Sequence, residues 1–227
     1  MADPVIVWLR QDLRLADQEA FAAAARDGAV VALYVLDDDG PGPWRIGGAQ
    51  RWWLHHSLAS LARTLHAHGV PLVLRRGAAA REVARLAGEL GTRRVHALRH
   101  YEPWWQEAER ALAGEVDLVL HDGTRLVAPD RVRTGAGGRY RIFTPYWRAL
   151  QELLPPPRPH PVPRSLAGPG GKIASDTLAD WNLLPNAPDW AGGFADWRPG
   201  EEGAHARLRR FAAEEVAGYP ATRNLPG

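Results

Sequence analysis

Short apolar runs alternate with segments of helical periodicity along the first half of the chain. Five runs have the length of strands, namely residues 5–9, 30–36, 70–74, 94–98 and 116–120, and the first two are continuously apolar, as expected for strands buried on both faces. Between them, apolar residues recur at helical spacing, which predicts helices over residues 17–28, 54–69, 83–91 and 103–113. This alternation is typical of α/β proteins, and it predicts a five-stranded parallel sheet, Rossmann-like, with helices on both faces.

Particular residues predict where some of the helices begin and end. Asp17 is expected to cap the first helix, and Gly28 is expected to end it. Further along, Thr144 and Pro145 predict the start of another helix, with the threonine as the cap and the proline at the first helical position. That helix is expected to end before the proline run 155–157.

The regular alternation is lost after about residue 127. Residues 155–200 are rich in proline, glycine and tryptophan, which predicts a long linker that is ordered by packing rather than a second core. The tryptophans at 181, 190 and 197 argue against disorder in this stretch. A last helix is expected over residues 201–217, and it has little sequence left to pack against, which indicates a truncated chain.

Composition excludes several classes of site. The 227 residues contain no cysteine, so disulfide bonds, thiolate metal sites and thiol nucleophiles are absent. The spacing of the nine histidines does not suggest a metal site, and none is predicted. The longest apolar run is of strand length, and the first residues lack the features of a secretory signal. We therefore expect a cytoplasmic protein that does not enter a membrane.

The basic residues are almost all arginine. Lys172 is the single lysine among 28 basic residues, although the net charge is only +2. A genome that favours arginine codons would explain this composition. Phosphate recognition is the functional interpretation, because the planar guanidinium group suits phosphate. Composition alone leaves both interpretations open.

The loop after the first strand is the first place to expect a ligand, because parallel sheets bind ligands at the carboxyl ends of their strands. This loop contains no glycine, which excludes a dinucleotide-binding turn there, and the chain has neither a P-loop nor a hydrolase elbow. Instead, its charges alternate in sign at Arg10, Asp12, Arg14 and Asp17. We expect these four residues to form an interlocked cluster of salt bridges that shapes the loop; contact with a polar cofactor is the alternative.

Five blocks in order along the chain resemble signatures of the photolyase/cryptochrome family. Residues 8–17 (WLRQDLRLAD) are similar to its opening signature, W-F/L-R-x-D-L-R-L-x-D. Residues 49–58 resemble its second helix, and residues 101–103 resemble the segment after its fourth strand. Residues 140–147 (YRIFTPYW) are similar to Y-x-V-F-T-P-F/Y-W, and residues 219–226 (YPATRNLP) to Y-x-x-x-R-N/D-x-P. Within the family, the chain resembles bacterial class I cyclobutane pyrimidine dimer photolyases.

The resemblance implies the N-terminal half of a deoxyribodipyrimidine photo-lyase. Such a lyase has an α/β antenna domain, here 1–130, then a linker, 131–200, and a helical FAD-binding domain, of which 201–227 would be the start. In the full-length flavoprotein, excited reduced FAD passes an electron to a cyclobutane dimer flipped out of UV-damaged DNA. The whole protein would be a monomer, whereas this half would harvest light, contain no catalytic residue and be inactive by itself.

The resemblance also assigns roles to particular residues. Tyr219 would contact FAD, and Arg223 would contact the DNA backbone. The antenna pocket is expected among Arg10, Leu36, Asp37, Arg51, His100 and Glu102. Trp104 and Trp105 replace the Asn-Glu of folate-binding members, and His100 replaces an acidic residue of deazaflavin-binding members. The antenna chromophore therefore stays open between deazaflavin, folate, flavin and none, and the two tryptophans would either stack on a ring or fill the pocket.

Two other functions stay open at this stage. A cryptochrome-type blue-light sensor would share the fold and the flavin without repairing DNA, and a stand-alone nucleotide-binding α/β protein would be complete at 227 residues. In the family, the electron-transfer tryptophans lie in the helical domain. Trp8, Trp52, Trp53 and Trp147 are accordingly expected to serve in core or interface packing.

Overall fold

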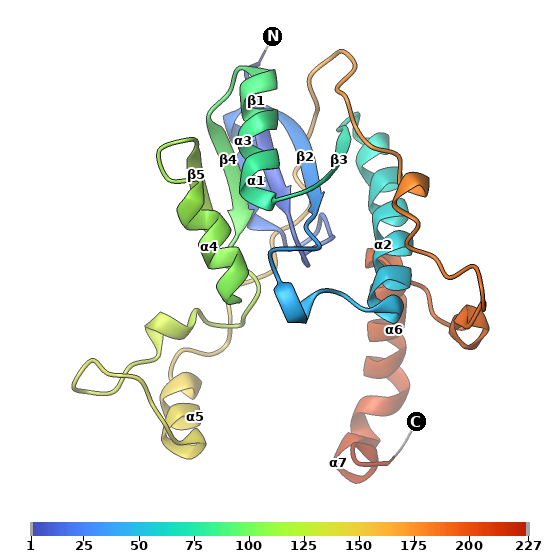
Figure 1. Cartoon of the computed structure of the whole chain (residues 1–227). Coiled ribbons are helices and arrows are strands. Elements are labelled where there is room, and N and C mark those ends of the chain that lie inside the picture. Colours follow the sequence, from blue (N-terminus) through green and yellow to red (C-terminus); the bar gives the residue numbers. More distant parts are fainter. Residues whose placement is uncertain (1, 226–227) are drawn as a thin grey trace.

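The computed structural model describes residues 2–225, and its centre is a single five-stranded sheet (Figure 1). All neighbouring strands are parallel, and their order is β3-β2-β1-β4-β5. The strands are β1 (Pro4–Leu9), β2 (Ala29–Leu36), β3 (Leu72–Arg76), β4 (Arg94–Leu98) and β5 (Asp117–His121). The predicted five-stranded parallel sheet is confirmed. β3 begins two residues later than expected, because the Val70 N–H bonds to the Leu65 carbonyl and closes the preceding helix.

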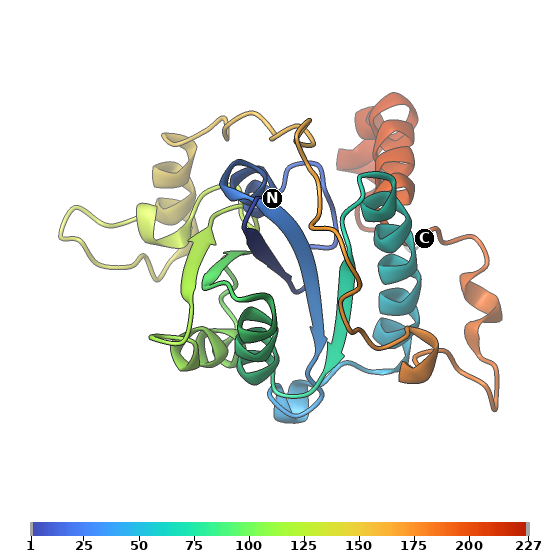
Figure 2. The same ribbon diagram turned by 90° about the horizontal axis from the view of Figure 1, so that it is seen from above.

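Helices cover both faces of the sheet (Figure 2). They are α1 (Glu19–Asp27), α2 (Gly48–Ala67), α3 (Ala79–Leu90) and α4 (Pro103–Ala111). The central strand β1 shows why two cores form, since successive side chains of a strand point to opposite faces. Val5, Val7 and Leu9 pack with α1 and α2, whereas Ile6 and Trp8 pack with α3 and α4.

The N-terminus of α1 differs from the prediction. Gln18, not Asp17, is the cap, and its side chain accepts a hydrogen bond from the Ala20 N–H at 3.3 Å. Asp17 has a positive φ of 52° and accepts a hydrogen bond from the His160 N–H, which ties the linker to this loop. Aspartate adopts this left-handed conformation more readily than most residues, because its short polar side chain can hydrogen-bond locally, so Asp17 turns the chain before the helix begins. Gly28 ends α1 as predicted.

The helix in the second half of the chain, α5 (Phe143–Gln151), also begins earlier than predicted. Ile142 is its cap, so Thr144 and Pro145 lie within the first turn rather than at the boundary. Proline is accepted there because the first-turn N–H groups of a helix have no carbonyl partner within it. The helix ends before Pro155, as predicted.

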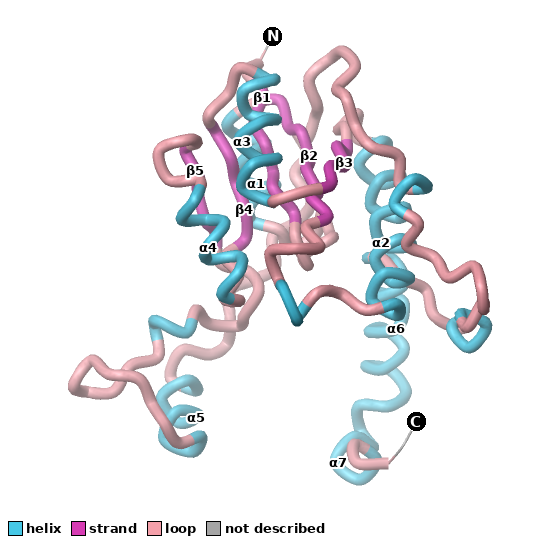
Figure 3. The backbone as a smooth tube through the Cα atoms, viewed as in Figure 1, coloured by secondary structure: helices cyan, strands magenta, loops and turns pink. Residues whose placement is uncertain are grey.

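The linker crosses the molecule as a mostly non-helical segment (Figure 3). Trp181 is buried in a third apolar cluster with Leu36 and Leu54, which confirms that packing orders this part. Further along, Trp197 meets Trp53 of α2 edge to face, with ring centroids 5.8 Å apart, but remains largely exposed. The linker is therefore attached to α2 at several points rather than forming a core of its own.

The four tryptophans expected to pack in the core or at interfaces have different environments. Trp8 is fully buried, and Trp52 and Trp53 contact the linker, as predicted. Trp147 does not follow the prediction within the described chain, because it is 41% exposed and stacks on Phe143 of its own helix. The helix is short and carries its aromatic residues one turn apart, so they meet each other rather than the sheet.

The last predicted helix is present but interrupted. α6 (Glu201–Arg210) continues through a π-helical segment (Phe211–Glu215) and a 3-10 turn (Val216–Gly218) into α7 (Tyr219–Thr222). Pro226, the last residue of the fifth sequence block, lies outside the described residues. None of the helices in residues 2–225 is both long and apolar enough to span a bilayer.

Two histidines connect the edge of the sheet to α1. His96 of β4 and His121 of β5 stack face to face, with His96 Nδ1 and His121 Nε2 2.8 Å apart. His96 Nε2 lies 3.1 Å from the carboxylate of Asp27 in α1. Burial lowers the pKa of both rings, and the charge of His121 lowers that of His96 further. One ring must donate and the other accept in this contact, so the pair is stable with at least one neutral histidine.

We expect the free energy of unfolding to decrease as the pH falls below about 6.5, the ordinary pKa of histidine. The folded state resists protonation of the pair, whereas the unfolded chain takes up those protons freely. Urea unfolding between about pH 8 and pH 5 measures the effect. His121→Gln should show a shallower loss of stability than the original chain, and the exposed His66→Gln is the matched control. A pH dependence unchanged by His121→Gln would contradict this explanation.

Candidate functional site

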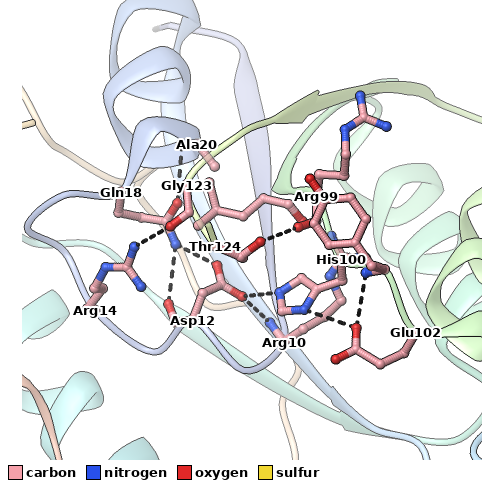
Figure 4. A network of polar contacts seen from close by, with 12 residues as sticks. Arg10, Asp12, Arg14, Gln18, Ala20, Arg99, His100, Glu102, Gly123 and Thr124 are labelled. Atoms are coloured by element: carbon pink, nitrogen blue, oxygen red, sulfur yellow. Dashed lines mark hydrogen bonds and ion pairs between the residues drawn. The ribbon is translucent and has the colours of Figure 1, made fainter. Parts of the chain in front are cut away.

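The strand order reverses between β1 and β4, and parallel sheets bind ligands at such a position. Two loops meet there, residues 10–18 after β1 and residues 99–102 after β4. Figure 4 shows Asp12 from the first loop and His100 from the second pointing toward each other. The candidate site is therefore built from these two loops and the start of α4.

Asp12 is the centre of the polar network. Its Oδ1 accepts a hydrogen bond from the Arg10 N–H at 3.0 Å and lies 3.2 Å from His100 Nε2. Its Oδ2 accepts a hydrogen bond from the Gln18 amide at 2.5 Å. Burial alone would raise the pKa of Asp12, but the hydrogen bond and charge of His100, with the Arg10 and Gln18 donors, outweigh burial and lower it. Asp12 is therefore a buried carboxylate held in its charged form.

Arg10 lies in the wall of the site and is 2% exposed. Its guanidinium donates to Glu109 Oε1 at 2.6 Å and to the Leu98 carbonyl, and it stacks 4.5 Å above the Trp8 ring. Trp105 packs edge to face on Trp8 and lies 5.7 Å from the Arg10 guanidinium. Trp105 therefore packs in the wall of the site beside Trp8 and Arg10.

The predicted cluster of salt bridges within the first loop is wrong. Arg10 pairs with Glu109 and Asp12 with His100, whereas Arg14 donates to the carbonyl of Asp17 and to that of Gly123. In residues 2–225, none of the four charged loop residues forms an ion pair with another. Their side chains leave the loop in different directions, so each reaches a partner on another element.

The structure divides the six residues expected at the antenna pocket into two groups. Arg10, His100 and Glu102 lie at the ends of β1 and β4, and Glu102 Oε2 is 3.7 Å from His100 Nδ1. Leu36, Asp37 and Arg51 instead lie around the end of β2.

The residues at the end of β2 are committed to the fold. Leu36 is buried in the third apolar cluster. The Asp37 carboxylate accepts hydrogen bonds from the N–H groups of Gly40 at 2.7 Å and Ala79 at 2.9 Å, which fixes the start of α3. Arg51 forms an ion pair with Asp38. These side chains shape the edge of the sheet, and their polar groups are already occupied by protein atoms.

Tyr34 connects the two groups electrostatically, and sequence reasoning missed it. Burial, together with the negative charges of Asp38 and Asp12, raises the pKa of its phenol. Tyr34 therefore stays protonated between the two clusters at ordinary pH. Glu109 was missed as well, although it follows Trp105 by four residues and so occupies the same face of α4.

A cavity of about 740 Å³ opens beside His100. Its basic lining comes from Arg99, Arg125, Arg133 and Arg139, and its aromatic lining from Tyr101, Tyr140 and Tyr146. Of the six residues predicted for the antenna pocket, His100 is the one that lines it. Arg99, Tyr101, Gln106 and Glu109 come from the loop after β4 and from α4, and the rest of the lining comes from segment 125–146. Tyr140 and Tyr146 lie in the fourth sequence block, but strand and motif patterns gave no signal that this segment approaches the sheet.

Tyr219 and Arg223 lie away from this edge, at the end of the C-terminal helical segment (Figure 1). The Arg223 N–H bonds to the Tyr219 carbonyl at 2.9 Å, so the two residues share one helical turn. Tyr219 is 50% exposed and meets Phe211 edge to face, and Arg223 is exposed. Both side chains are accessible to a ligand or to a second domain.

Comparisons with known proteins give a consistent result. The DNA photolyase family model matches residues 5–164. A deoxyribodipyrimidine photo-lyase of Agrobacterium fabrum is 41% identical, and the match covers 98% of this chain and 47% of that protein. A deoxyribodipyrimidine photo-lyase of Synechococcus is 29% identical, and the match covers 100% of this chain and 49% of that protein. A solved class III photolyase from Agrobacterium tumefaciens matches with a TM-score of 0.90 at 39% identity, covering 100% of this chain and 48% of its own.

A cryptochrome of Synechocystis has a TM-score of 0.81 at 20% identity, covering 99% of this chain and 50% of its own, and so shares the fold. The chain spans about half the length of the curated relatives that it matches. Because the solved photolyase at 39% identity belongs to class III, membership of class I stays a prediction.

Asp12→Ala should lower the free energy of unfolding by about 3–5 kcal/mol, because it leaves His100 and the Gln18 amide without their buried partner. Asp39→Ala, an exposed aspartate on a neighbouring loop, is the matched control and should change stability by less than about 0.5 kcal/mol. Urea unfolding at neutral pH measures both variants. Equal stability of the two variants would show that the Asp12 network does not hold the site together.

Proposed function

The chain belongs to the DNA photolyase family, and from this membership we propose that it is the N-terminal, light-harvesting half of a deoxyribodipyrimidine photo-lyase. The observation that carries the proposal is the 39% identical class III photolyase, which covers the whole chain at a TM-score of 0.90. The similar cryptochrome is 20% identical and supports the shared fold alone, so we favour the repair enzyme over the light sensor.

For the whole polypeptide, the proposal is light-dependent splitting of cyclobutane pyrimidine dimers in UV-damaged DNA. Bound reduced FAD would supply the excited-state electron for this reaction. Tyr219 would contact the FAD and Arg223 a DNA phosphate, and their exposure on one turn of α7 is compatible with both roles. The proposal includes the division into an antenna domain, 1–130, a linker, 131–200, and the start of a helical domain, 201–227, in a monomeric, cytoplasmic protein.

We place the antenna site in the cavity beside His100 rather than at the end of β2. The end of β2 offers polar groups that already bind protein atoms, whereas the cavity offers four arginines and three tyrosines. A planar heteroaromatic ring would stack on the tyrosines, and an anionic tail would bind the arginines. Folates and flavin nucleotides both have this combination, and a volume of about 740 Å³ is sufficient for either.

The repair activity is tested with the complete polypeptide encoded with this sequence. DNA that contains thymine dimers is incubated with the FAD-loaded protein in near-UV or blue light, and the remaining dimers are counted. We expect dimers to disappear in the light and to persist in a parallel dark sample. Intact bound flavin without any loss of dimers would contradict the repair proposal and favour the light sensor.

The antenna site is tested with the 227-residue chain, using a reduced folate and FMN as separate fluorescent probes. We expect one of them to bind, and Arg125→Gln/Arg139→Gln to weaken it by about tenfold or more, because charge-assisted hydrogen bonds to the anionic tail are lost. Arg26→Gln/Arg63→Gln, which removes the same charge elsewhere, should leave the affinity unchanged. Binding of neither probe, or equal effects of the two variants, would contradict this placement.

A further inference from the structure

Positive charge is concentrated in one part of the chain. Residues 125–158, which we call the arginine lobe, contain seven arginines and two carboxylates, Asp130 and Glu152, and so carry a net charge of +5. Because the whole chain carries +2, the remaining residues carry −3. The small net charge therefore conceals a separation of charge between the lobe and the rest of the protein.

The arginines of the lobe also differ from the others in their partners. On the sheet and its helices, arginines such as Arg51, Arg75 and Arg94 form ion pairs with nearby carboxylates. Among the described residues, no carboxylate forms an ion pair with any of the seven arginines in the lobe. Their charge is thus not neutralised within the described chain.

The seven arginines fall into two sets. Arg125, Arg133 and Arg139 line the cavity beside His100 and were assigned above to an antenna chromophore. The other four are exposed outside that cavity, and we call them the outer arginines: Arg131, Arg141, Arg148 and Arg158. They lie in α5 and in the segments on either side of it, which project below the sheet in Figure 1.

Two aromatic side chains share α5 with one of the outer arginines. Phe143 and Trp147 stack with an interplanar angle of 11° and ring centroids 6.3 Å apart. They are 71% and 41% exposed, although a helix of a folded protein normally turns such residues inward. The lobe therefore presents exposed aromatic rings beside unpaired arginines.

We propose that the outer arginines bind the phosphate backbone of DNA, as a contact surface separate from Arg223. Guanidinium groups fit phosphate oxygens, and unpaired surface arginines gain affinity by releasing the counterions of the DNA. The aromatic pair favours a nucleic acid over an acidic protein, because bases offer faces on which the rings can stack. The negative charge of the remaining residues directs a DNA strand toward the lobe. This inference rests on the proposed function for the identity of the polyanion.

The test measures binding of the 227-residue chain to an undamaged, fluorescein-labelled DNA duplex in the dark, over a series of salt concentrations. The variant Arg131→Gln/Arg141→Gln/Arg148→Gln/Arg158→Gln should lower the magnitude of the slope of log K against log salt by about 3–4, since each phosphate contact contributes about 0.9. The original chain should show a slope at least that large. A slope near zero for the original chain would overturn the proposal.

The matched control is Arg26→Gln/Arg45→Gln/Arg63→Gln/Arg110→Gln. These four arginines are also exposed, lie outside the lobe and change the net charge by the same amount. The control should keep the original slope, and both variants should keep the melting temperature, because none of the eight side chains is buried. An equal loss of slope in the two variants would show that the effect depends only on net charge, and it would overturn the proposal.

Two further measurements distinguish this proposal from binding of an acidic protein and from the proposed repair function. Poly-L-glutamate is added as a competitor at equal charge concentration; displacement as effective as that by unlabelled DNA would assign the lobe to an acidic protein partner and overturn the proposal. The repair assay depends on a lesion and light, whereas this slope depends on neither. If the outer-arginine variant changes the slope but the complete polypeptide does not repair DNA, the DNA contact is supported and the proposed function is contradicted. If the polypeptide repairs DNA but the slope is unchanged in the variant, the proposed function is supported and the DNA contact is contradicted.

Discussion

Two buried charges at the crossover between β1 and β4 hold the ligand-binding edge of the sheet together. Arg10 and Asp12 are separated by one residue, yet each meets its partner on another element: Arg10 pairs with Glu109 of α4, and Asp12 contacts His100 after β4. A charge removed from water costs several kcal/mol unless it is paired and hydrogen-bonded. The loop after β1 therefore has to remain docked against the β4–α4 unit.

One wall of the cavity beside His100 belongs to this arrangement. Glu109 and His100 line it from the side of the sheet, and both are engaged with the buried charges. The opposite wall comes from the arginine lobe, where the arginines lack carboxylate partners among the described residues. A wall whose Glu109 carboxylate is already paired, facing a wall rich in arginine, suits a ligand that brings a planar ring and negative charge of its own.

The C-terminal helical segment is attached to the same loop. Both carboxylate oxygens of Glu201 accept hydrogen bonds from the first loop, one from the Leu15 N–H at 2.9 Å and one from the Ala16 N–H at 2.8 Å. Beyond this anchor, α6 and the turns after it expose Leu208, Val216 and Tyr219. Apolar side chains that lie exposed along one segment are typical of a surface that packs against another domain, and the proposed helical domain would cover them.

Most of the α/β architecture followed from the sequence, because β1 and β2 are continuous apolar runs and the helices have their own period. Val30 to Leu36 could be assigned to a buried strand from these seven residues alone. Gly28 could be assigned to the end of α1 because glycine, which lacks a side chain, is favoured at helix ends. Helix starts were predicted less well. Asp17 and Gln18 are both able to cap a helix, and the contact of Asp17 with His160, far away in the linker, decided between them.

The sequence by itself determined the layers of this protein, the class of its sheet and the order of the blocks that relate it to its family, since each of these depends on residues close together in the chain. Tertiary structure alone decided the partners of the buried charges and the lining of the cavity. Arg10 and Glu109 are 99 positions apart, and Asp12 and His100 are 88 apart. Local periodicity carries no information about which distant residue a charge will meet, because that depends on how the strands are ordered in the sheet and where each loop leaves it.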